Sequence, residues 1–439
     1  MDREDIMRFV EDNDVKFIRL QFTDICGIMK NIAINETNLE NAMDGVTFDG
    51  YSIEGFARTE ESDMLLIPDS DTLNLIPWRP QQGKVARFIC DVLLRDGTPF
   101  EGDPRYVLKK MTQKARELGY TFNVEPECEF FLFHTDDQGL PTTQTHDTAG
   151  YFDLAPIDLG ENARREMCFA LENMGFFVES SHHEAAPGQH EIDFKYDEAL
   201  RTADNIETFK MVVKIIAQKH GLHATFMPKP LRDGAGTGMH LNMSLLRGDI
   251  DAFADPKDPL GLSRDAYWFM GGIIKHIRGM TAIFNPLVNS YKRLTPGNEA
   301  PAYIMWSRRN RSPLIRIPAP QGGSTLVELL SPDPTCNPYL ALTVLLAAGL
   351  EGIAQHIDPP AEFPRNIAAM TSQEIAAARL ERLPESLGDA LDAMEADPLI
   401  RETLGEHIFT RYLQVKRSEW AEYSRQVHDW ERERYLALY

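Results

Sequence analysis

The sequence has few of the features that mark several large classes of protein. It contains five cysteines in 439 residues, at positions 26, 90, 128, 168 and 336, and no two of them form a CxxC pair. This spacing argues against a zinc finger and against the disulfide framework of a small secreted protein. The pattern fits a reducing compartment, and we expect a cytoplasmic location.

Positive charge and long apolar runs are also scarce. The chain has 45 basic and 67 acidic residues, a formal net charge of −22, and no local basic stripe, which argues against a nucleic-acid partner. The first residues, MDREDIMRF, are acidic and lack the apolar core of a signal peptide. The longest apolar stretch, ALTVLLAAGL at 341–350, is too short to span a bilayer. We therefore expect a core helix there and no membrane association.

Several catalytic motifs are missing. The sequence has no GxxxxGK[ST], no HExxH, and no H-x-E combined with PCxxC. The segment DGAGTGMH resembles a dinucleotide-binding loop only loosely, because Met239 stands where the pattern requires a glycine. If ATP is bound, another architecture must bind it.

The composition and the positions of residues that favour turns predict two domains. A hydrophobic content of 43% over this length can bury a large core. The Gly/Pro/Asp-rich segment RDGTPFEGDP at 95–104 is a plausible boundary, so we expect domains at 1–100 and 101–439. Asp103 and Pro104 open a predicted helix that Gly119 closes, and Thr371 with Glu374 forms a capping box. The remaining patterns predict helices near 161–174, 202–220 and 264–283, and strands near 176–180, 189–196, 223–227, 237–245, 313–317 and 324–330.

Several predicted strands carry acidic or polar residues at alternate positions, which places them on one face. Glu328 stands between Leu326 and Leu330 on its strand, and a buried carboxylate needs a partner or a metal. The full candidate set is Glu127, Glu129, Glu184, Glu191, His240, Asn242, Ser244 and Glu328. Oxygen-rich sets of this kind suit Mg²⁺ or Mn²⁺. The alternative is that each strand simply shows the wet face of an antiparallel sheet.

A second group of polar residues follows a loop at 289–320. It contains Arg293, Arg308, Arg309, Arg311 and Arg316, with Glu299 in a Pro/Gly-flanked segment. Arginine binds phosphate and carboxylate oxygens bidentately, so a site for phosphoryl chemistry is indicated. A solvated charged loop is the alternative.

Seven segments in order along the chain are informative together: FDGYSIEGF, EPECEFFLF, HHEAAPGQHE, GTGMHLNMSL, NSYKRLTPGNEAP, RNRSPLIRIP and PDPTCNPYLA. Their sequences and order are similar to the motifs of type I glutamine synthetases of the α-like subtype, and the similarity covers almost the whole chain. The resemblance implies an α+β protein with an N-terminal β-grasp domain and a large catalytic domain whose antiparallel sheet forms the active site. It also implies a dodecamer of two stacked hexameric rings, with sites between neighbouring subunits.

The resemblance assigns roles to individual residues. It makes Glu129, Glu184 and Glu191 ligands of one metal ion. It makes Glu127, His240 and Glu328 ligands of a second ion, which would explain the carboxylate of Glu328 in its apolar strand.

The implied reaction uses ATP to phosphorylate the γ-carboxylate of glutamate, after which ammonia attacks the acyl phosphate. Arg311 and Arg316 match arginines that handle phosphate, and Arg293 matches one that binds the substrate carboxylate. Glu299 matches a loop residue that closes the site, and Asp49 of a neighbouring subunit matches the base that takes a proton from ammonium. Gly236 matches a substrate-binding position, and Asn242 and Ser244 are assigned to the ATP and phosphate side.

The chain departs from the family pattern at the amino-acid end of the substrate site. The family has Arg-x-Glu-x-Arg around Glu328, and this chain has Leu326 and Leu330 in place of both arginines. The loss of a bidentate contact typically costs a few kcal/mol. Ala235 replaces an asparagine, Tyr51 a serine, and Gln321 a residue that is commonly basic.

Two positions bear on regulation. Ala368 replaces the tyrosine that is adenylylated in some members, and Arg58 matches an arginine linked to feedback inhibition. The main interpretation is an ATP-dependent glutamine synthetase. Two alternatives remain: a related ligase that uses another acid or amine, and a silent paralogue that serves as a structural or regulatory subunit.

Overall fold

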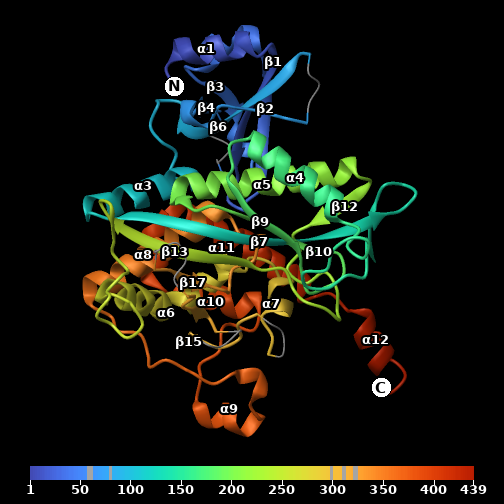
Figure 1. Ribbon diagram of the computed structural model, residues 1–439, viewed down its shortest axis with the longest axis vertical. Coiled ribbons are helices and arrows are strands. Elements are labelled where there is room, and N and C mark those ends of the chain that lie inside the picture. The colour runs from blue at the N-terminus through green and yellow to red at the C-terminus, as the bar shows by residue number, and fades with distance from the viewer. Residues whose placement is uncertain (57–62, 79–81, 297–299, 309–312, 320–324) are drawn as a thin grey trace.

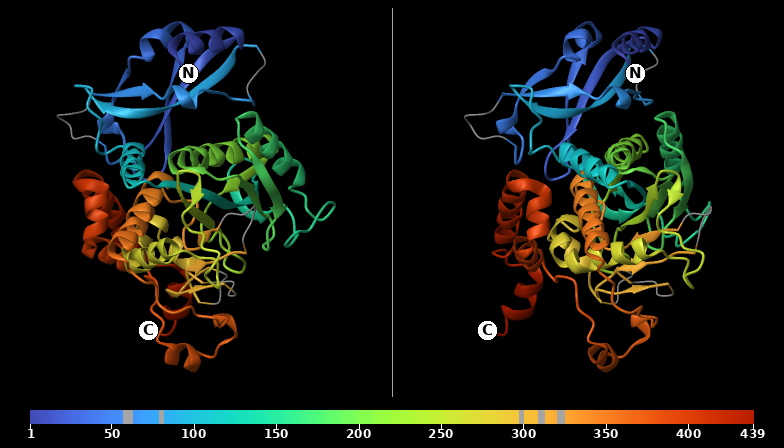
Figure 2. Two further views of the ribbon diagram at one scale, coloured as in Figure 1. Left: turned by 60° about the vertical axis from the view of Figure 1, so that its left-hand side comes forward. Right: turned by 90° about the vertical axis from the view of Figure 1, so that its left-hand side faces the viewer.

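The computed structural model describes the chain from Met1 to Tyr439 except for residues 57–62, 79–81, 297–299, 309–312 and 320–324. The chain forms a smaller N-terminal part stacked on one end of a larger part (Figure 1). Figure 2 shows the same stacking from two further sides, with the C-terminal helices running along the outside of the larger part.

The N-terminal part is a mixed sheet covered by a helix. The strand order is β2-β1-β6-β4-β3, with β5 paired to β6, and the β1–β6 pair is parallel while the other pairs are antiparallel. Strand β4 alternates between buried and more exposed residues, as expected for a sheet with one face against a core. The elements are α1 (Arg3–Asp12), β1 (Val15–Thr23), β2 (Met29–Asn35), η1 (Glu36–Asn38), α2 (Leu39–Ala42), β3 (Val46–Asp49), η2 (Gly50–Ser52), β4 (Asp63–Pro68), η4 (Ser70–Thr72), β5 (Asn74–Leu75) and β6 (Lys84–Leu94).

The larger part is built on a second sheet. Its order is β15-β16-β17-β13-β7-β10-β9, with β8, β11 and β12 also paired to β7 and β14 to β13. The long strand β7 is central, and its pairs are all antiparallel. The strands are β7 (Thr121–Thr135), β8 (Pro141–Thr145), β9 (Val178–His183), β10 (Gln189–Phe194), β11 (Asp197–Glu198), β12 (Leu222–Thr225), β13 (Met239–Arg247), β14 (Ile250–Asp251), β15 (Trp306–Ser307), β16 (Ile315–Arg316) and β17 (Val327–Leu329).

Several helices of the larger part pack against this sheet or against one another. The predicted caps are confirmed at both tested helix starts: Asp103 caps α3 with Pro104 in the first turn, and Thr371 and Glu374 form a capping box on α9. The helices are α3 (Pro104–Glu117), α4 (Glu161–Asn173), α5 (Ala199–Lys219), α6 (Arg264–Phe284), α7 (Ser290–Arg293), α8 (Pro338–Gln355), η5 (Ile367–Ala369), α9 (Ser372–Ala378), α10 (Leu387–Ala396), α11 (Pro398–Tyr423) and α12 (Asp429–Tyr435).

Helix α8 contains the apolar stretch at 341–350. By length and composition its 18 residues could cross a membrane, but 78% of that window is buried inside the protein. The helix packs on α6 with backbone contact, since a Cβ at Gly272 would lie 2.0 Å from the Ala348 carbonyl oxygen and one at Gly352 would lie 2.0 Å from that of Trp268. The predicted core helix is thus confirmed, although it is longer than the apolar run.

Other predictions differ from the structure in extent. Within the described residues, the strands expected at 313–317 and 324–330 shorten to β16 and β17, because Pro313 and Pro318 flank β16 and Pro332 follows β17. The pattern of Trp420, Tyr423, Val427 and Trp430 predicts one helical stripe, but the structure divides it: α11 ends at Tyr423, Val427 lies between helices, and Trp430 belongs to α12. Trp420 packs against the core, whereas Val427 and Trp430 are exposed.

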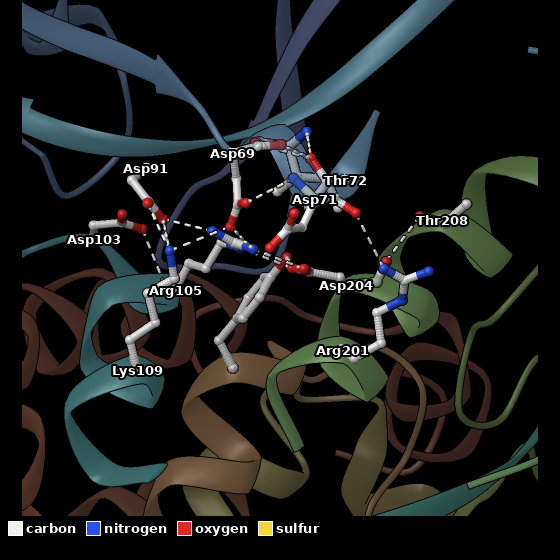
Figure 3. Close-up of polar contacts among 12 residues, drawn as sticks. Asp69, Asp71, Thr72, Asp91, Asp103, Arg105, Lys109, Arg201, Asp204 and Thr208 are labelled. Atoms are coloured by element: carbon white, nitrogen blue, oxygen red, sulfur yellow. Dashed lines mark hydrogen bonds and ion pairs between the residues drawn. The ribbon is translucent and has the colours of Figure 1, made fainter. Parts of the chain in front are cut away.

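The junction between the two parts is a buried network of ion pairs (Figure 3). Arg105 of α3 has a side chain that is 4% exposed and donates to Asp69 (2.8 Å) and Asp91 (2.6 Å) of the N-terminal part and to Asp204 (2.9 Å) of α5. Lys109, one turn further along α3, also pairs with Asp91. Opposite charges therefore join the two parts of the chain.

Candidate active site

The candidate site lies where five neighbouring strands of the larger sheet meet. The strands β17, β13, β7, β10 and β9 are consecutive in the sheet. Register places His240 opposite Glu127 and places Glu191 opposite Glu129. The alternation seen in the sequence therefore brings polar side chains of separate strands onto one face.

These side chains line a cavity of about 600 Å³. Of the predicted site residues, the ones in its lining are Glu127, Glu129, Glu184, Glu191, Gly236, His240, Arg293, Arg316 and Glu328. The lining also contains Ala235 and Leu330, two of the positions that depart from the family pattern.

One cluster in the cavity consists of Glu127, His240 and Glu328, whose ligand atoms lie within 4.8 Å of one another. His240 Nδ1 is 3.4 Å from Glu127 Oε2 and 3.8 Å from Glu328 Oε1. Burial alone would lower the pKa of His240, but Glu127, Glu129 and Glu328 raise it. Asn242 Nδ2 donates to Glu127 Oε1 at 2.8 Å, so this amide orients a carboxylate of the cluster.

The buried carboxylate of Glu328 has a partner on the neighbouring strand. Glu328 is 0% exposed, and Arg316 of β16 lies opposite it in register. The Arg316 guanidinium donates to both carboxylate oxygens, through Nε to Oε2 and through Nη2 to Oε1 at 3.0 Å. Burial still raises the pKa of Glu328, although His240 and Arg316 act against it.

A second cluster consists of His182, Glu184 and Glu191. His182 Nε2 lies 3.0 Å from Glu184 Oε1 and 3.9 Å from Glu191 Oε1. Glu129 adjoins this cluster, because it lies opposite Glu191 in register. Its Oε2 accepts hydrogen bonds from Gly238 N and Gln189 Nε2, both at 2.8 Å.

The carboxylates of the cavity crowd one another. Burial raises the pKa of Glu129 to about 7. Burial, followed by repulsion from Asp193, Glu129, Glu127 and Glu184, raises the pKa of Glu191 well above its ordinary value. Carboxylates in this state are stabilised by a cation. The donor set of carboxylate oxygens and imidazoles therefore fits hard divalent ions such as Mg²⁺ or Mn²⁺.

Arg293, at the end of α7, closes one side of the cavity. It is 3% exposed and donates to the carbonyl oxygens of Ser331 (2.8 Å) and Leu330 (3.0 Å). Two glycines make room for it: a Cβ at Gly236 would lie 2.8 Å from Arg293 Cγ, and one at Gly238 would lie 2.8 Å from Nη2. A basic group thus stands beside the apolar side chains of Leu330 and Ala235.

Other predicted residues lie elsewhere. Ser244 is buried farther along β13, four residues beyond His240. Asp49 is exposed at the end of β3 in the N-terminal part, where it accepts from Tyr51 N at 3.0 Å and Ser52 Oγ at 3.2 Å. Arg58, Glu299 and Arg311 lie outside the described residues.

Four further residues of the lining have no role in the site predicted from the sequence: Tyr151, His182, Gln189 and Asp193. His182 precedes Glu184 by two positions, so strand alternation could have found it. Gln189 and Asp193 stand two positions before and two positions after Glu191, so the same alternation could have identified them. Tyr151 also lines the cavity, and its ring packs on Phe152 and edge-on against His182. No local signal marks Tyr151, because a loop brings it to the cavity.

Comparison with known proteins supports one family. The model of the glutamine synthetase catalytic domain matches residues 101–435, and that of the glutamine synthetase β-grasp domain matches residues 14–95. A glutamine synthetase of Clostridium saccharobutylicum is 59% identical over 438 residues, covering 100% of this chain and 99% of that protein. A glutamine synthetase of Thermus thermophilus is 55% identical over 442 residues, with the same coverage.

Solved structures agree with this. A structure described as a GmaS/ADP complex has a TM-score of 0.90 at 33% identity and covers 98% of this chain and 99% of its own. A Plasmodium falciparum glutamine synthetase, at 24% identity and 99% coverage of both chains, has the same fold with a TM-score of 0.88. Because two family models and two close relatives span the chain, the protein belongs to the glutamine synthetase family.

Proposed function

We propose that this protein is a glutamine synthetase, an ATP-dependent ligase that joins ammonia to the γ-carboxylate of glutamate. The observation that carries the proposal is the cavity, where carboxylates of neighbouring strands face one another beside two arginines. The names of the relatives at 59% and 55% identity support the same reaction.

The cavity residues suit two divalent ions, Mg²⁺ or Mn²⁺. We assign Glu129, Glu184 and Glu191 to one ion, with His182 beside them. We assign the other ion to the cluster of Glu127, His240 and Glu328. Such ions neutralise charge on the phosphates of ATP and on the phosphoryl group in transfer.

The side chains of the protein divide the remaining work. Transfer of the γ-phosphoryl group of ATP to glutamate gives an acyl phosphate, and attack by ammonia then releases phosphate. We propose that Arg316 releases Glu328 and contacts phosphate oxygens, together with Asn242, Ser244 and Arg311. Guanidinium donors of this kind stabilise the charge of phosphoryl transfer.

We propose that different residues act on the glutamate substrate and on the ammonia that attacks its acyl phosphate. We assign the substrate carboxylate to Arg293 and the backbone at Gly236, and closure of the site to Glu299. Asp49 is proposed to take a proton from ammonium, which requires an ionised carboxylate near the nucleophile. Since Asp49 is exposed and outside the lining of the cavity of its own chain, a neighbouring copy would have to supply it.

This arrangement supports an oligomer, and we propose the dodecamer of two hexameric rings. We also propose domain limits of 1–100 and 101–439, a cytoplasmic location, and a regulatory role for Arg58. The separate hydrophobic cores of the two parts support the division into domains.

The test is release of phosphate and formation of glutamine from Mg·ATP, glutamate and ammonium. We expect turnover of roughly 1 per second or more, and none with Glu328→Gln. The double variant Leu326→Arg, Leu330→Arg is assayed beside the unmodified protein. A lower KM for glutamate in the variant would measure how much the two leucines weaken glutamate binding. Phosphate release with another acid or amine but not with glutamate and ammonium would contradict the proposal, as would silence with every substrate.

A further inference from the structure

The turn between β9 and β10 carries part of the proposed metal site. Glu184 follows β9 directly, and Glu191 lies in β10. The turn is closed by Glu184 N donating to the Gln189 carbonyl oxygen at 2.7 Å. It is also tight: Gly188 has φ +68°, and a Cβ there would lie 2.9 Å from the Leu132 carbonyl oxygen. The position of Glu184, and the point at which β10 begins, therefore depend on what holds this turn.

One buried carboxylate, Asp147, holds the turn from behind. Its Oδ1 accepts from Gly188 N at 2.9 Å and lies 3.0 Å from His183 Nε2. His183 is the last residue of β9 and Gly188 is the residue before β10, so Asp147 joins the two ends of the turn. Its Oδ2 is anchored by Leu159 N at 3.2 Å.

His183 extends this link to the backbone of a proposed ligand. Its second ring nitrogen, Nδ1, lies 2.7 Å from the carbonyl oxygen of Glu184. The histidine ring is 0% exposed and packs edge-on against His190, with ring centroids 4.7 Å apart. A line of contacts thus runs from Asp147 through His183 to the main chain of Glu184.

The other end of the turn reaches the cavity through Gln189. The Gln189 amide donates to Glu129 Oε2 at 2.8 Å and to the Gly236 carbonyl oxygen at 2.9 Å. A shift of Gly188 would carry Gln189 with it and disturb Glu129. Two of the three carboxylates of one proposed metal site, Glu184 and Glu129, are thus connected to the turn that Asp147 holds.

Asp147 also belongs to a group of possible metal ligands with Asp158, His183 and His190. A cation is already present there, because the buried Arg164 Nη1 lies 2.9 Å from Asp158 Oδ2 and 2.8 Å from His190 Nδ1. Since Arg164 supplies the positive charge, this group is a support and not a third metal site.

We propose that Asp147 is a positioning residue for the metal site of Glu129, Glu184 and Glu191, acting through His183 and Gly188. This inference rests on the proposed function, because it assumes the two metal sites. Groups that orient metal ligands typically change metal affinity by about 10- to 100-fold when they are replaced.

The test is titration of the purified full-length protein with Mn²⁺, with free Mn²⁺ measured by electron paramagnetic resonance. Two classes of Mn²⁺ sites are expected, one for each cluster. Glu184→Gln and His240→Asn each remove a ligand of one cluster, so the class that each variant weakens belongs to that cluster. We expect Asp147→Asn to weaken the Glu184 class by about 10- to 100-fold and to leave the His240 class unchanged. His183→Gln, which cannot bridge Asp147 and the Glu184 carbonyl together, gives a smaller loss in the same class and serves if Asp147→Asn does not fold.

The matched control is Asp204→Asn, which alters an equally buried carboxylate at the domain junction. It should lower the thermal midpoint without changing either Mn²⁺ class. Wild-type affinity in both classes of Asp147→Asn, or an equal loss in both, would overturn the positioning role. Fewer than two Mn²⁺ per chain in the unmodified protein would instead overturn the proposed metal sites themselves.

Discussion

The cavity and the domain junction both bury several carboxylates, but their charges are balanced differently. At the junction Arg105 reaches Asp69, Asp91 and Asp204 at once, and Lys109 adds a second cation (Figure 3). Burial alone would raise the pKa of Asp69, yet Arg105 and Lys109 lower it. The charges of Asp69, Asp91 and Asp204 are thus paired within the fold.

In the cavity the carboxylates face one another. The pKa of Glu129 rises to about 7 and that of Glu191 rises well above its ordinary value, by burial and by mutual repulsion. Crowded acids of this kind cost stability in the absence of a cation. The comparison teaches that buried charge paired with cations holds the protein together, whereas crowded buried carboxylates such as Glu129 and Glu191 mark a place where a ligand binds.

The largest expected effect comes from relieving the repulsion in the cavity. Glu191→Gln should lower glutamine formation by about 10³-fold or more, about 4 kcal/mol in the barrier, because it removes a proposed metal ligand. It should also raise the free energy of unfolding of the metal-free protein by about 1 kcal/mol, because a crowded charge is lost. Turnover assays and urea unfolding in EDTA at pH 8 measure the two effects.

The control for Glu191→Gln is Glu166→Gln, at the surface, where Glu166 pairs with Lys219 and His220. It should leave turnover unchanged. A Glu191→Gln protein that is both active and less stable would show that the cavity is a paired network like the junction.

The reverse experiment breaks the junction. Arg105→Met leaves Asp69, Asp91 and Asp204 without their shared guanidinium, and breaking a buried ion pair costs about 3–5 kcal/mol. Turnover per folded molecule should stay within a few-fold of the unmodified protein. The exposed pair of Arg264 and Asp358 gives the control, since Arg264→Met should cost less than about 1 kcal/mol. Equal stability of the two variants would contradict the role given to Arg105.

The sequence predicted the cavity better than the junction, for a physical reason. Alternation along a strand is local, so it placed Glu127 and Glu129 on one face of their strand and marked Glu191 on another strand. The family resemblance then assigned Glu184 to a metal ion and Arg293 to the substrate carboxylate. The junction has no such signal, because Arg105 and Asp204 are 99 residues apart and meet only through packing of α3 on α5.

The register between paired strands is a second feature, besides helix packing, that local sequence patterns do not determine. The sequence suggested a metal as the partner of Glu328, but pairing of β16 with β17 puts Arg316 opposite it. His182 and Tyr151 reach the cavity by the same long-range pairing and by loop packing. The predicted roles of Arg58, Glu299 and Arg311 fall outside the described residues and stay predictions.

Removal of metal should lower the stability of the cavity variant less than that of the junction variant. This difference is smaller than the main effects described above. With Mn²⁺ at 100 times the dissociation constant of each site, each bound ion stabilises the folded protein by about 2.7 kcal/mol. EDTA should therefore lower the stability of the unmodified protein and of Arg105→Met by the sum for two ions, and that of Glu191→Gln by the share of one ion. Thermal unfolding at fixed protein concentration measures the shift, and an equal shift in all three proteins would place the metal outside the cavity.

The smallest expected effect concerns His276, which resembles the junction because it pairs with two carboxylates. These ion pairs are lost when the histidine deprotonates at higher pH. His276 of α6 lies between two carboxylates, with Nδ1 2.7 Å from Asp397 Oδ2 and Nε2 2.5 Å from Glu351 Oε2. Burial alone would lower the pKa of His276, but Asp397 and Glu351 raise it above the ordinary value of 6.5. A raised folded-state pKa means that the stabilisation is complete below pH 6.5 and is lost as the pH rises through the folded value.

His276→Gln tests this, because glutamine does not titrate. Between pH 6 and pH 9 the unmodified protein should lose about 1–2 kcal/mol more stability than the variant, the size of a charge-assisted hydrogen bond. Urea unfolding of both proteins in EDTA at several pH values measures the difference and removes any contribution from metal. Parallel pH profiles would mean that His276 is neutral between its two carboxylates. That result would make this site resemble the crowded cavity, whereas diverging profiles would show that a proton here does what Arg105 does at the junction.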